Sequence, residues 1–253
     1  MGEAVGRRRL SWQTARIDAL QALTPRVMRV VLRPDRWVRP RPGQHLDVRL
    51  TAEDGYQAQR SYSLLSPPQR TGLYELGIER LDDGEVSTWF HDKAQHGETI
   101  EVLGPVGGHF VLDESNTRPA LLIGGGSGVV PLLSMAAQRV GAYSQAHTTL
   151  LVAARHLDEV LLWPTLQRWE AFTPRFRSRL ALSRDTCAPR AQDHVGRIDG
   201  ADVAWALQQL GDVATESAQV FICGRNDFVE SIVHMVTGLN VPEVSIRTER
   251  FGS

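Results

Sequence analysis

The stretch Leu121-Leu122-Ile123-Gly124-Gly125-Gly126-Ser127-Gly128-Val129-Val130-Pro131 decides the fold of the second half of this chain. An apolar run leads into a glycine-rich turn, and a second apolar segment follows at once. This order predicts a buried strand, a tight turn and a helix that holds Pro131 in its first turn. Glycines let the backbone approach a bound group closely, and the N–H groups of a helix start attract anions. The stretch therefore predicts a phosphate-binding turn, although an ordinary tight connection between strand and helix has the same pattern.

The rest of the second half repeats the alternation of apolar run and helical segment. Apolar runs without polar alternation, separated by helices, predict a parallel sheet that is buried on both faces. A further strand closes the sequence. The predicted strands are residues 120–123, 148–153, 179–182, 220–223 and 244–247.

The first half has a different pattern, with short alternating strands and frequent turns. Together with one helix at residues 86–95, this pattern predicts a closed, six-stranded antiparallel β-barrel. The polar segment Asp113–Arg118 is the predicted linker, so the expected domains are residues 1–115 and residues 116–253. The predicted barrel strands are residues 15–20, 26–32, 45–50, 60–65, 74–81 and 99–103.

The composition excludes several classes of function. The net charge of −1 gives no general attraction to nucleic acid or to a membrane. The two cysteines, Cys187 and Cys223, are too few for an iron–sulfur cluster or a four-cysteine zinc site. The eight histidines show no metal-ligand spacing, so no metal site is expected. Charge is uneven, however, because residues 1–49 hold eleven arginines against four acidic residues. They form either a docking face for an acidic protein or ordinary solvated strand faces.

Neither a signal peptide nor a membrane helix is expected. The three arginines at residues 7–9 are not followed by the apolar core that a signal peptide requires. Residues 119–138 carry no charge, but their glycines and Pro131 indicate a strand, a turn and a helix start. A cytoplasmic location is therefore expected.

The strand Arg60-Ser61-Tyr62-Ser63 has the side chains that a flavin needs. Side chains alternate along a strand, so Arg60 and Tyr62 share one face and Ser61 and Ser63 the other. Arg60 can bind phosphate through two hydrogen bonds, and Tyr62 can stack on an isoalloxazine ring. Ser63, at the end of the strand, can reach the N5 edge of that ring. Taken alone, the same residues also suit an ordinary surface strand.

Several motifs together resemble the ferredoxin–NADP reductase superfamily of flavoproteins. They are Arg60 to Ser66, the helix start Gly84-Glu85-Val86-Ser87, the loop Gly104-Pro105-Val106-Gly107 and the glycine-rich stretch that ends at Pro131. The resemblance extends from about residue 15 to the end of the chain. It implies a bound FAD whose pyrophosphate lies at the helix start, near Gly84, Val86 and Ser87. FMN is disfavoured because this segment suits a pyrophosphate.

The same resemblance implies a nicotinamide dinucleotide site in the second half. Gly125, Gly126, Ser127 and Gly128 would hold its pyrophosphate. Cys223-Gly224 resembles the family's Cys-Gly-Pro, whose cysteine lies beside nicotinamide C4, but Arg225 replaces the proline.

The choice between NADPH and NADH depends on three residues. Ser183 and Arg184 resemble the pair that binds the 2′-phosphate of NADP in plant-type relatives, and Arg155 could add a second cation. NADPH is therefore favoured over NADH. The alternative is that both arginines are surface residues of an arginine-rich protein.

The end of the chain, Arg247-Thr248-Glu249-Arg250-Phe251, resembles the family's terminal Glu-x-aromatic motif. This places Glu249 near Ser63 and Cys223 and lets Phe251 shield the flavin. Ser63, Cys223 and Glu249 are thus the expected catalytic residues.

The resemblance implies an NAD(P)H-dependent flavoprotein reductase that passes electrons singly to a separate protein. The expected acceptor is a ferredoxin, a haem protein, an oxygenase or a molybdenum enzyme, and it is separate because no cluster-binding cysteines are present. Two alternatives stay open: a reductase of free flavin or quinone, and a non-catalytic flavin subunit of a larger oxidoreductase.

Overall fold

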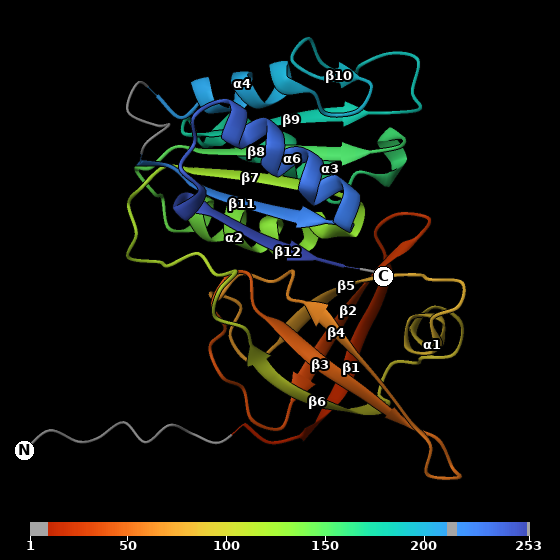
Figure 1. The fold of residues 1–253 in the computed structure, drawn as a ribbon. Helices are drawn as coiled ribbons and strands as arrows, with labels where there is room; N and C mark the ends of the chain where they lie inside the picture. The colour runs from red at the N-terminus through yellow and green to blue at the C-terminus, as the bar shows by residue number, and fades with distance from the viewer. Residues whose placement is uncertain (1–9, 212–216, 252–253) are drawn as a thin grey trace, which may run out of the picture.

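The computed structural model describes residues 10–211 and 217–251, and it contains two β-sheets that lie one above the other (Figure 1). The arginines at residues 7–9 and the last two residues lie outside the described part. No helix within the described ranges is long and apolar enough to cross a membrane.

The first sheet is antiparallel and six-stranded, as predicted, with the strand order β4-β3-β6-β1-β2-β5. Its two edge strands meet at an isolated bridge between Leu64 and Leu76, which closes the barrel. Helix α1 (Glu85–Asp92) lies outside the strands and buries Phe90 against them. The strands are β1 (Gln13–Ala22), β2 (Val27–Pro34), β3 (His45–Thr51), β4 (Gln57–Ser63), β5 (Tyr74–Glu79) and β6 (Thr99–Val106).

The second sheet is parallel, with the order β10-β9-β8-β7-β11-β12. Its strands are β7 (Ala120–Gly125), β8 (Thr148–Ala154), β9 (Phe176–Leu182), β10 (His194–Val195), β11 (Gln219–Gly224) and β12 (Ile246–Arg250). The α-helices are α2 (Val129–Gly141), α3 (Trp163–Phe172), α4 (Gly200–Gln208) and α6 (Asn226–Gly238). Short 3₁₀ turns cover Gly126–Gly128, Leu157–Glu159 and Glu243–Ser245.

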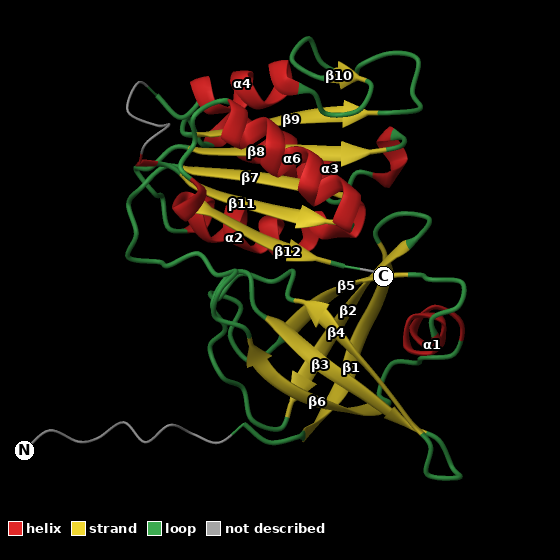
Figure 2. Cartoon of the chain, viewed as in Figure 1, coloured by secondary structure: helices red, strands yellow, loops and turns green. Residues whose placement is uncertain are grey.

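Helices cover both faces of this sheet (Figure 2). Leu122 of β7 packs in one apolar cluster with α2 and α3, whereas its neighbours Leu121 and Ile123 pack in another with α4 and α6. Consecutive residues of one strand are thus buried on opposite sides. This explains the unbroken apolar runs and confirms the predicted parallel sheet.

The bounds of several predicted strands differ from the observed ones by two or three residues: β4 is Gln57–Ser63 where residues 60–65 are predicted, and β9 begins at Phe176 where residue 179 is predicted. The last strand begins at Ile246, because Pro242 and the 3₁₀ turn Glu243–Ser245 take up residues that the pattern assigns to the strand. The two-residue strand β10 is not predicted at all. Within the described part of the chain it pairs with Ala181 and Leu182 alone, and it has no apolar run of its own.

The two sheets share a packed junction. Leu65, next to the end of β4, belongs to the same apolar cluster as Leu132 and Met135 of α2. Ser134 of α2 donates a hydrogen bond of 2.8 Å to the carbonyl of Ser66. The carboxyl ends of the parallel strands therefore lie in a fixed position over the barrel.

Candidate active site at the junction of the two sheets

Ser63 ends strand β4 where the barrel meets the second sheet. Its backbone pairs with His45, and its side chain is buried. Its hydroxyl has no hydrogen-bond partner among the described residues. A buried hydroxyl is nearly always satisfied, and leaving one unsatisfied costs free energy. Ser63 is thus placed to hydrogen-bond a bound group at this point.

Tyr62 lies one residue before, on the face that it shares with Leu46. Its ring meets the ring of Phe90 edge-on, with 6.2 Å between the centroids. Burial raises the pKa of Tyr62 far above its ordinary value, and the nearby charge of Arg60 opposes that shift. The residue is therefore a neutral phenol whose ring is held in place by α1, as a stacking surface must be.

Arg60 is exposed and has no carboxylate partner among the residues described; its guanidinium donates to the carbonyl of Gln59 at 2.7 Å. Nearby, the Tyr56 hydroxyl donates to the Glu85 carboxylate in the first turn of α1, at 3.0 Å. This contact raises the pKa of Tyr56, while the charge of Arg60 acts to lower it. Arg60 therefore lies close to the start of α1, where its guanidinium and the N–H groups of the helix start can bind a phosphate beside the Glu85 carboxylate.

The hydroxyls of two expected flavin-binding residues, Ser61 and Ser87, make hydrogen bonds within the protein. Ser61 donates to Asp47 at 2.5 Å. Ser87 is buried, accepts from the backbone N–H of Leu81 at 3.2 Å and donates to the carbonyl of Gly84 at 3.1 Å. Ser87 thus fixes the turn before α1, and Gly84 leaves room for it, since a Cβ there would lie 2.5 Å from the Ser87 oxygen. For a ligand, this segment offers backbone N–H groups, including that of Val86.

The glycine turn of the second sheet lies directly against the end of β11. Gly126 adopts a left-handed backbone with φ +57°, which favours glycine. A Cβ at Gly128 would stand 2.5 Å from the carbonyl oxygen of Cys223, and one at Gly125 would touch the ring of Phe228. The turn and Cys223 can approach each other this closely only because Gly128 has no side chain.

Ser127 makes an unexpected contact in this turn. Its hydroxyl donates a hydrogen bond of 2.6 Å to Glu79, the last residue of β5. The bond joins the glycine turn to the barrel. The sequence pattern does not predict a role for Glu79; its one signal is an acidic residue that ends an otherwise buried strand.

Cys223 and Glu249 form the buried centre of the site. They occupy paired positions on the parallel strands β11 and β12. Burial and the neighbouring Glu249 raise the pKa of the Cys223 thiol well above its ordinary value. Burial also raises the pKa of Glu249, to about 7, and one of its carboxylate oxygens has no hydrogen-bond partner in the described part of the chain.

The backbone at Arg225 is compatible with the proline that the family has at this position. Arg225 has a φ of −67°, the angle that proline would impose, and it caps α6. The N–H of Phe251 donates to the carbonyl of Gly224 at 3.0 Å, which ties the end of β12 to the end of β11. Phe251 itself is partly buried against the apolar core at the junction.

Ser183 and Arg184 lie beside Arg155 at the carboxyl edge of β8 and β9. The N–H of Arg184 donates to the carbonyl of Arg155 at 2.9 Å. The guanidinium of Arg155 is already paired with Glu159 at 2.6 Å, whereas exposed Arg184 has no ion pair with any described residue. Asp185 is unavailable for a ribose, because its two oxygens accept from His156 and from the N–H of Leu157. Arg184 is therefore the freer of the two candidate cations.

A surface pocket of about 180 Å³ opens beside Asp185, in the segment that follows β9. Leu157, Asp185, Thr186, Cys187 and Pro189 line it.

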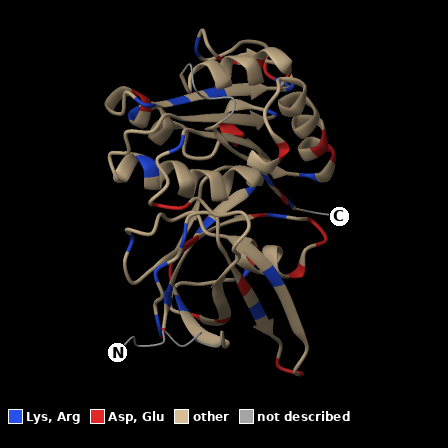
Figure 3. Ribbon diagram, turned by 60° about the vertical axis from the view of Figure 1, so that its left-hand side comes forward, with Lys and Arg blue, Asp and Glu red and all other residues tan. Residues whose placement is uncertain are grey.

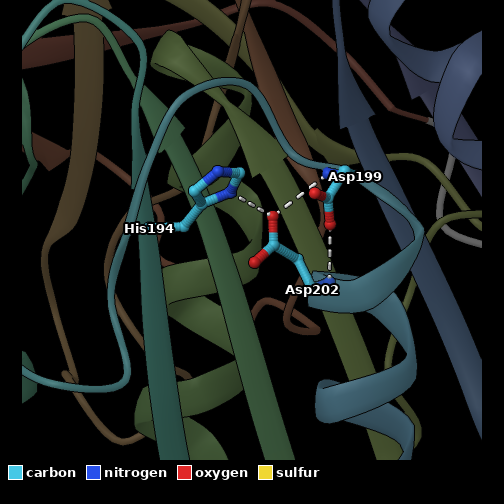
Figure 4. A group of neighbouring side chains, drawn as sticks. All are labelled: His194, Asp199 and Asp202. Atoms are coloured by element: carbon cyan, nitrogen blue, oxygen red, sulfur yellow. Dashed lines mark hydrogen bonds and ion pairs between the residues drawn. The ribbon is translucent and has the colours of Figure 1, made fainter.

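A second polar cluster, His194, Asp199 and Asp202, joins β10 to the start of α4 (Figure 4), and Figure 1 shows both elements on the side of the second sheet away from the barrel. One oxygen of Asp202 accepts from His194 at 2.7 Å and from the backbone N–H of Asp199 at 3.0 Å. Its other oxygen lies 2.8 Å from the guanidinium of Arg179. Asp199 in turn caps α4. These carboxylates hold β10 to the start of α4, and Arg179 already supplies their cation.

Most of the described arginines in the first 49 residues lie near carboxylates, and Figure 3 shows both basic and acidic residues on the barrel. Between residues 10 and 49, all but Arg36 lie within 4.0 Å of a carboxylate oxygen. Some partners lie far along the chain; Arg49, for example, pairs with Glu101 of β6. Counting charges within a segment overlooks these partners. The described part of the segment therefore gives little support to a basic docking face.

Both halves of the chain match known domain families. Residues 23–111 match the oxidoreductase FAD-binding domain, and residues 122–234 match the oxidoreductase NAD-binding domain.

Curated relatives include two reductases. The chain is 29% identical to ferredoxin–NADP reductase B of Sorangium cellulosum over 199 residues, which are 78% of this chain and 80% of that protein. It is 31% identical over 220 residues to the ferredoxin reductase component of 3-ketosteroid-9-alpha-monooxygenase from Mycobacterium tuberculosis. That match covers 87% of this chain but 57% of the relative. The chain thus spans little more than half of some of its relatives.

Solved structures share the fold. The FAD/NAD-binding domain of nitric oxide dioxygenase from Vibrio cholerae superposes with a TM-score of 0.82 at 20% identity, covering 95% of this chain and 99% of that one. A ferredoxin NADP+ reductase from Neisseria gonorrhoeae superposes with a TM-score of 0.75 at 19% identity, covering 94% of this chain and 98% of that one.

Proposed function

The chain belongs to the ferredoxin–NADP reductase superfamily, and from that premise we propose that it is an NAD(P)H-dependent flavoprotein reductase. It takes reducing equivalents from NADPH, in preference to NADH, through FAD. It passes them singly to a separate redox protein such as a ferredoxin. Two relatives whose names include ferredoxin support this choice of acceptor.

The observation that carries the proposal is the set of unsatisfied polar groups at the junction. The Ser63 hydroxyl and one oxygen of Glu249 are buried without a partner among the described residues. Arg60, near the start of α1, has no carboxylate partner among the described residues either. Such groups fit a flavin, which brings a phosphate for a cation and a polar ring edge for hydrogen bonds. When bound, FAD supplies the acceptance of a hydride and its release as single electrons.

The remaining roles follow from this chain's own side chains. Arg60 and the start of α1 would hold the pyrophosphate of FAD, and the rings of Tyr62 and Phe251 would contact its isoalloxazine ring. Ser63 donates a hydrogen bond at the reactive edge of the ring. Cys223, an uncharged thiol in a dry site, positions the nicotinamide instead of acting as a nucleophile.

Glu249 can hold a proton near neutral pH, because its pKa is about 7. Arg184 pairs with the 2′-phosphate of NADPH, with Ser183 beside it, and Arg155 contributes less because Glu159 already neutralises it.

Anaerobic titration of the FAD-loaded protein tests the proposal. NADPH should bleach the flavin absorbance, and NADH should do so at higher concentration. Cys223→Ser should keep the flavin but slow the bleaching. Absence of bleaching by either donor would contradict the reductase assignment and favour a non-catalytic flavin subunit.

A steady-state assay then identifies the acceptor. A ferredoxin should be reduced faster than free flavin or quinone at equal concentration. Faster reduction of the small molecules would instead identify a flavin or quinone reductase that needs no protein partner.

A further inference from the structure

Glu79 brings a carboxylate from the barrel to the glycine turn of the second sheet. One of its oxygens accepts from the Ser127 hydroxyl at 2.6 Å. Its side chain is about one-third exposed, at 33%. A negative charge therefore stands at the turn whose glycines and helix start are suited to bind a negative charge.

The ion pair between Glu79 and the neighbouring arginine is long and therefore weak. The nearest guanidinium nitrogen, from Arg26, lies 4.0 Å from the other carboxylate oxygen. Arg26 is fixed by its own hydrogen bond of 2.8 Å to the carbonyl of Arg80. Glu79 also acts on Arg155, because its charge contributes to the raised pKa of that guanidinium. The short bond to Ser127 is thus the main contact of this carboxylate.

A dinucleotide at this turn would compete with Glu79 in two ways. The Ser127 hydroxyl has one proton, so it can donate to Glu79 or to a phosphate oxygen but not to both. A pyrophosphate would also place like charge next to the carboxylate, and like charges a few ångströms apart repel at a protein surface. Bound dinucleotide and the present position of Glu79 therefore disfavour each other.

On the basis of the dinucleotide site proposed above, we propose that Glu79 is an anionic gate at the glycine turn. The pyrophosphate displaces the carboxylate from Ser127 toward Arg26, and the return of Glu79 favours release of the spent dinucleotide. Glu79 thus lowers the affinity of the site for its own dinucleotide. It acts through Ser127 and through charge, so it is a positioning residue and not a catalytic one.

Calorimetric binding of oxidised dinucleotides to the FAD-loaded protein tests the gate without turnover. The Kd values of NADP+, NAD+ and ADP-ribose are measured for the wild type, Glu79→Gln and Glu79→Ala. Glu79→Gln keeps an oxygen that can accept from Ser127 and removes only the charge. Both variants should bind all three ligands roughly fivefold more tightly or better, since a repelling charge is gone.

A charge-matched control separates the gate from a general change in net charge. Glu53, exposed in the turn between β3 and β4, has no interaction that involves the glycine turn, and Glu53→Gln should leave all three Kd values unchanged. Raising the salt concentration should narrow the difference between Glu79→Gln and the wild type, because salt screens the repulsion. Chemical unfolding of each variant confirms that it is folded.

The outcomes distinguish the gate from the function beneath it. Unchanged or weaker binding in both Glu79 variants, with normal binding in the wild type, would overturn the gate and leave the reductase assignment standing. Weaker binding in particular would make Glu79 a ligand of the dinucleotide. A wild type that binds none of the three ligands would overturn the dinucleotide site itself, and the gate with it.

Discussion

Cys223 and Glu249 are directly paired across the parallel strands β11 and β12; Cys223 is fully buried, and Glu249 is partly buried with one carboxylate oxygen out of contact with water. Both side chains have a raised pKa, which favours their protonated forms. The thiol keeps its proton, whereas the carboxyl, with a pKa of about 7, can gain or lose one near neutral pH. A strongly shifted carboxyl next to a thiol in a site with unsatisfied groups is typical of a functional centre.

Glu249 makes stability depend on pH in a defined direction. Its pKa rises from 4.5 to about 7 on folding, so the protonated form is favoured in the folded state. The Glu249 carboxyl makes its full contribution to the free energy of unfolding below about pH 4.5, and this contribution is lost as the pH rises through about 7. Replacing Glu249 by Gln removes this loss. Glu249→Gln should therefore raise the free energy of unfolding, relative to the wild type, by about 2 kcal/mol more at about pH 8 than at about pH 5.

Urea unfolding of the flavin-free protein at both pH values measures this difference. An equal effect of Glu249→Gln at the two pH values would mean that the carboxyl has an ordinary pKa and is open to water.

Ser63→Ala should have opposite effects without and with flavin. The Ser63 hydroxyl is buried without a partner among the described residues, so its removal should leave the flavin-free protein as stable or up to about 1 kcal/mol more stable. With FAD bound, the same change should lower stability and slow flavin reduction, because a hydrogen bond is lost. Thermal unfolding of both forms and stopped-flow reduction provide the measurements.

Ser66→Ala is the matched control. Ser66 is also buried, but its hydroxyl accepts from the N–H of Glu75 at 3.1 Å. Its loss should cost about 1–2 kcal/mol in the flavin-free protein. If Ser63→Ala destabilises the flavin-free protein as much as Ser66→Ala does, then the Ser63 hydroxyl already has a hydrogen-bond partner within the protein.

Much of this fold can be predicted from the sequence because its signals are local. The apolar runs of β7, β8 and β11 and the glycine turn each specify an element by composition alone. The faces of a strand are local information too. Because side chains alternate along β4, Tyr62 and Ser63 must lie on opposite faces. The final strand is displaced by two residues because the 3₁₀ turn before it leaves little trace in the pattern.

The contacts that the sequence does not predict connect residues far apart in the chain. Ser127 and Glu79 are 48 positions apart, and no spacing rule links a serine of a glycine turn to the end of a barrel strand. The sequence gives no partner for the hydroxyls of Ser61 and Ser87, yet Ser61 hydrogen-bonds to Asp47 and Ser87 to the backbone of the turn before α1. Which polar groups remain unpaired is a property of the packed junction.

Gly128 should tolerate no side chain. A Cβ there would lie 2.5 Å from the carbonyl oxygen of Cys223, so either α2 or the end of β11 would have to move. Gly128→Ala should destabilise the protein by about 2 kcal/mol or more and weaken dinucleotide binding. Gly108→Ala is the control, because a Cβ at Gly108 meets nothing within 4 Å, and it should change stability by less than about 0.5 kcal/mol. Equal effects of the two changes in urea unfolding would show that the glycine turn lies further from β11.

Arg184→Ala should separate the two nicotinamide donors. Arg184 is exposed and has no ion pair with a described residue, so its guanidinium is available for the 2′-phosphate that NADPH has and NADH lacks. A charge-assisted hydrogen bond contributes enough that its loss should raise the KM for NADPH about tenfold. The KM for NADH should stay unchanged. Arg155→Ala should have a smaller effect on NADPH, because Glu159 already pairs with that arginine at 2.6 Å.

Arg168→Ala controls for the general loss of positive charge and should alter neither KM. Arg168 is exposed on α3, and Thr165 is the one side-chain partner that it has among the described residues. If Arg184→Ala raises both KM values equally, then Arg184 contacts a part of the dinucleotide that the two donors share. The preference for NADPH would then lose its structural basis, and NADH would become the expected donor.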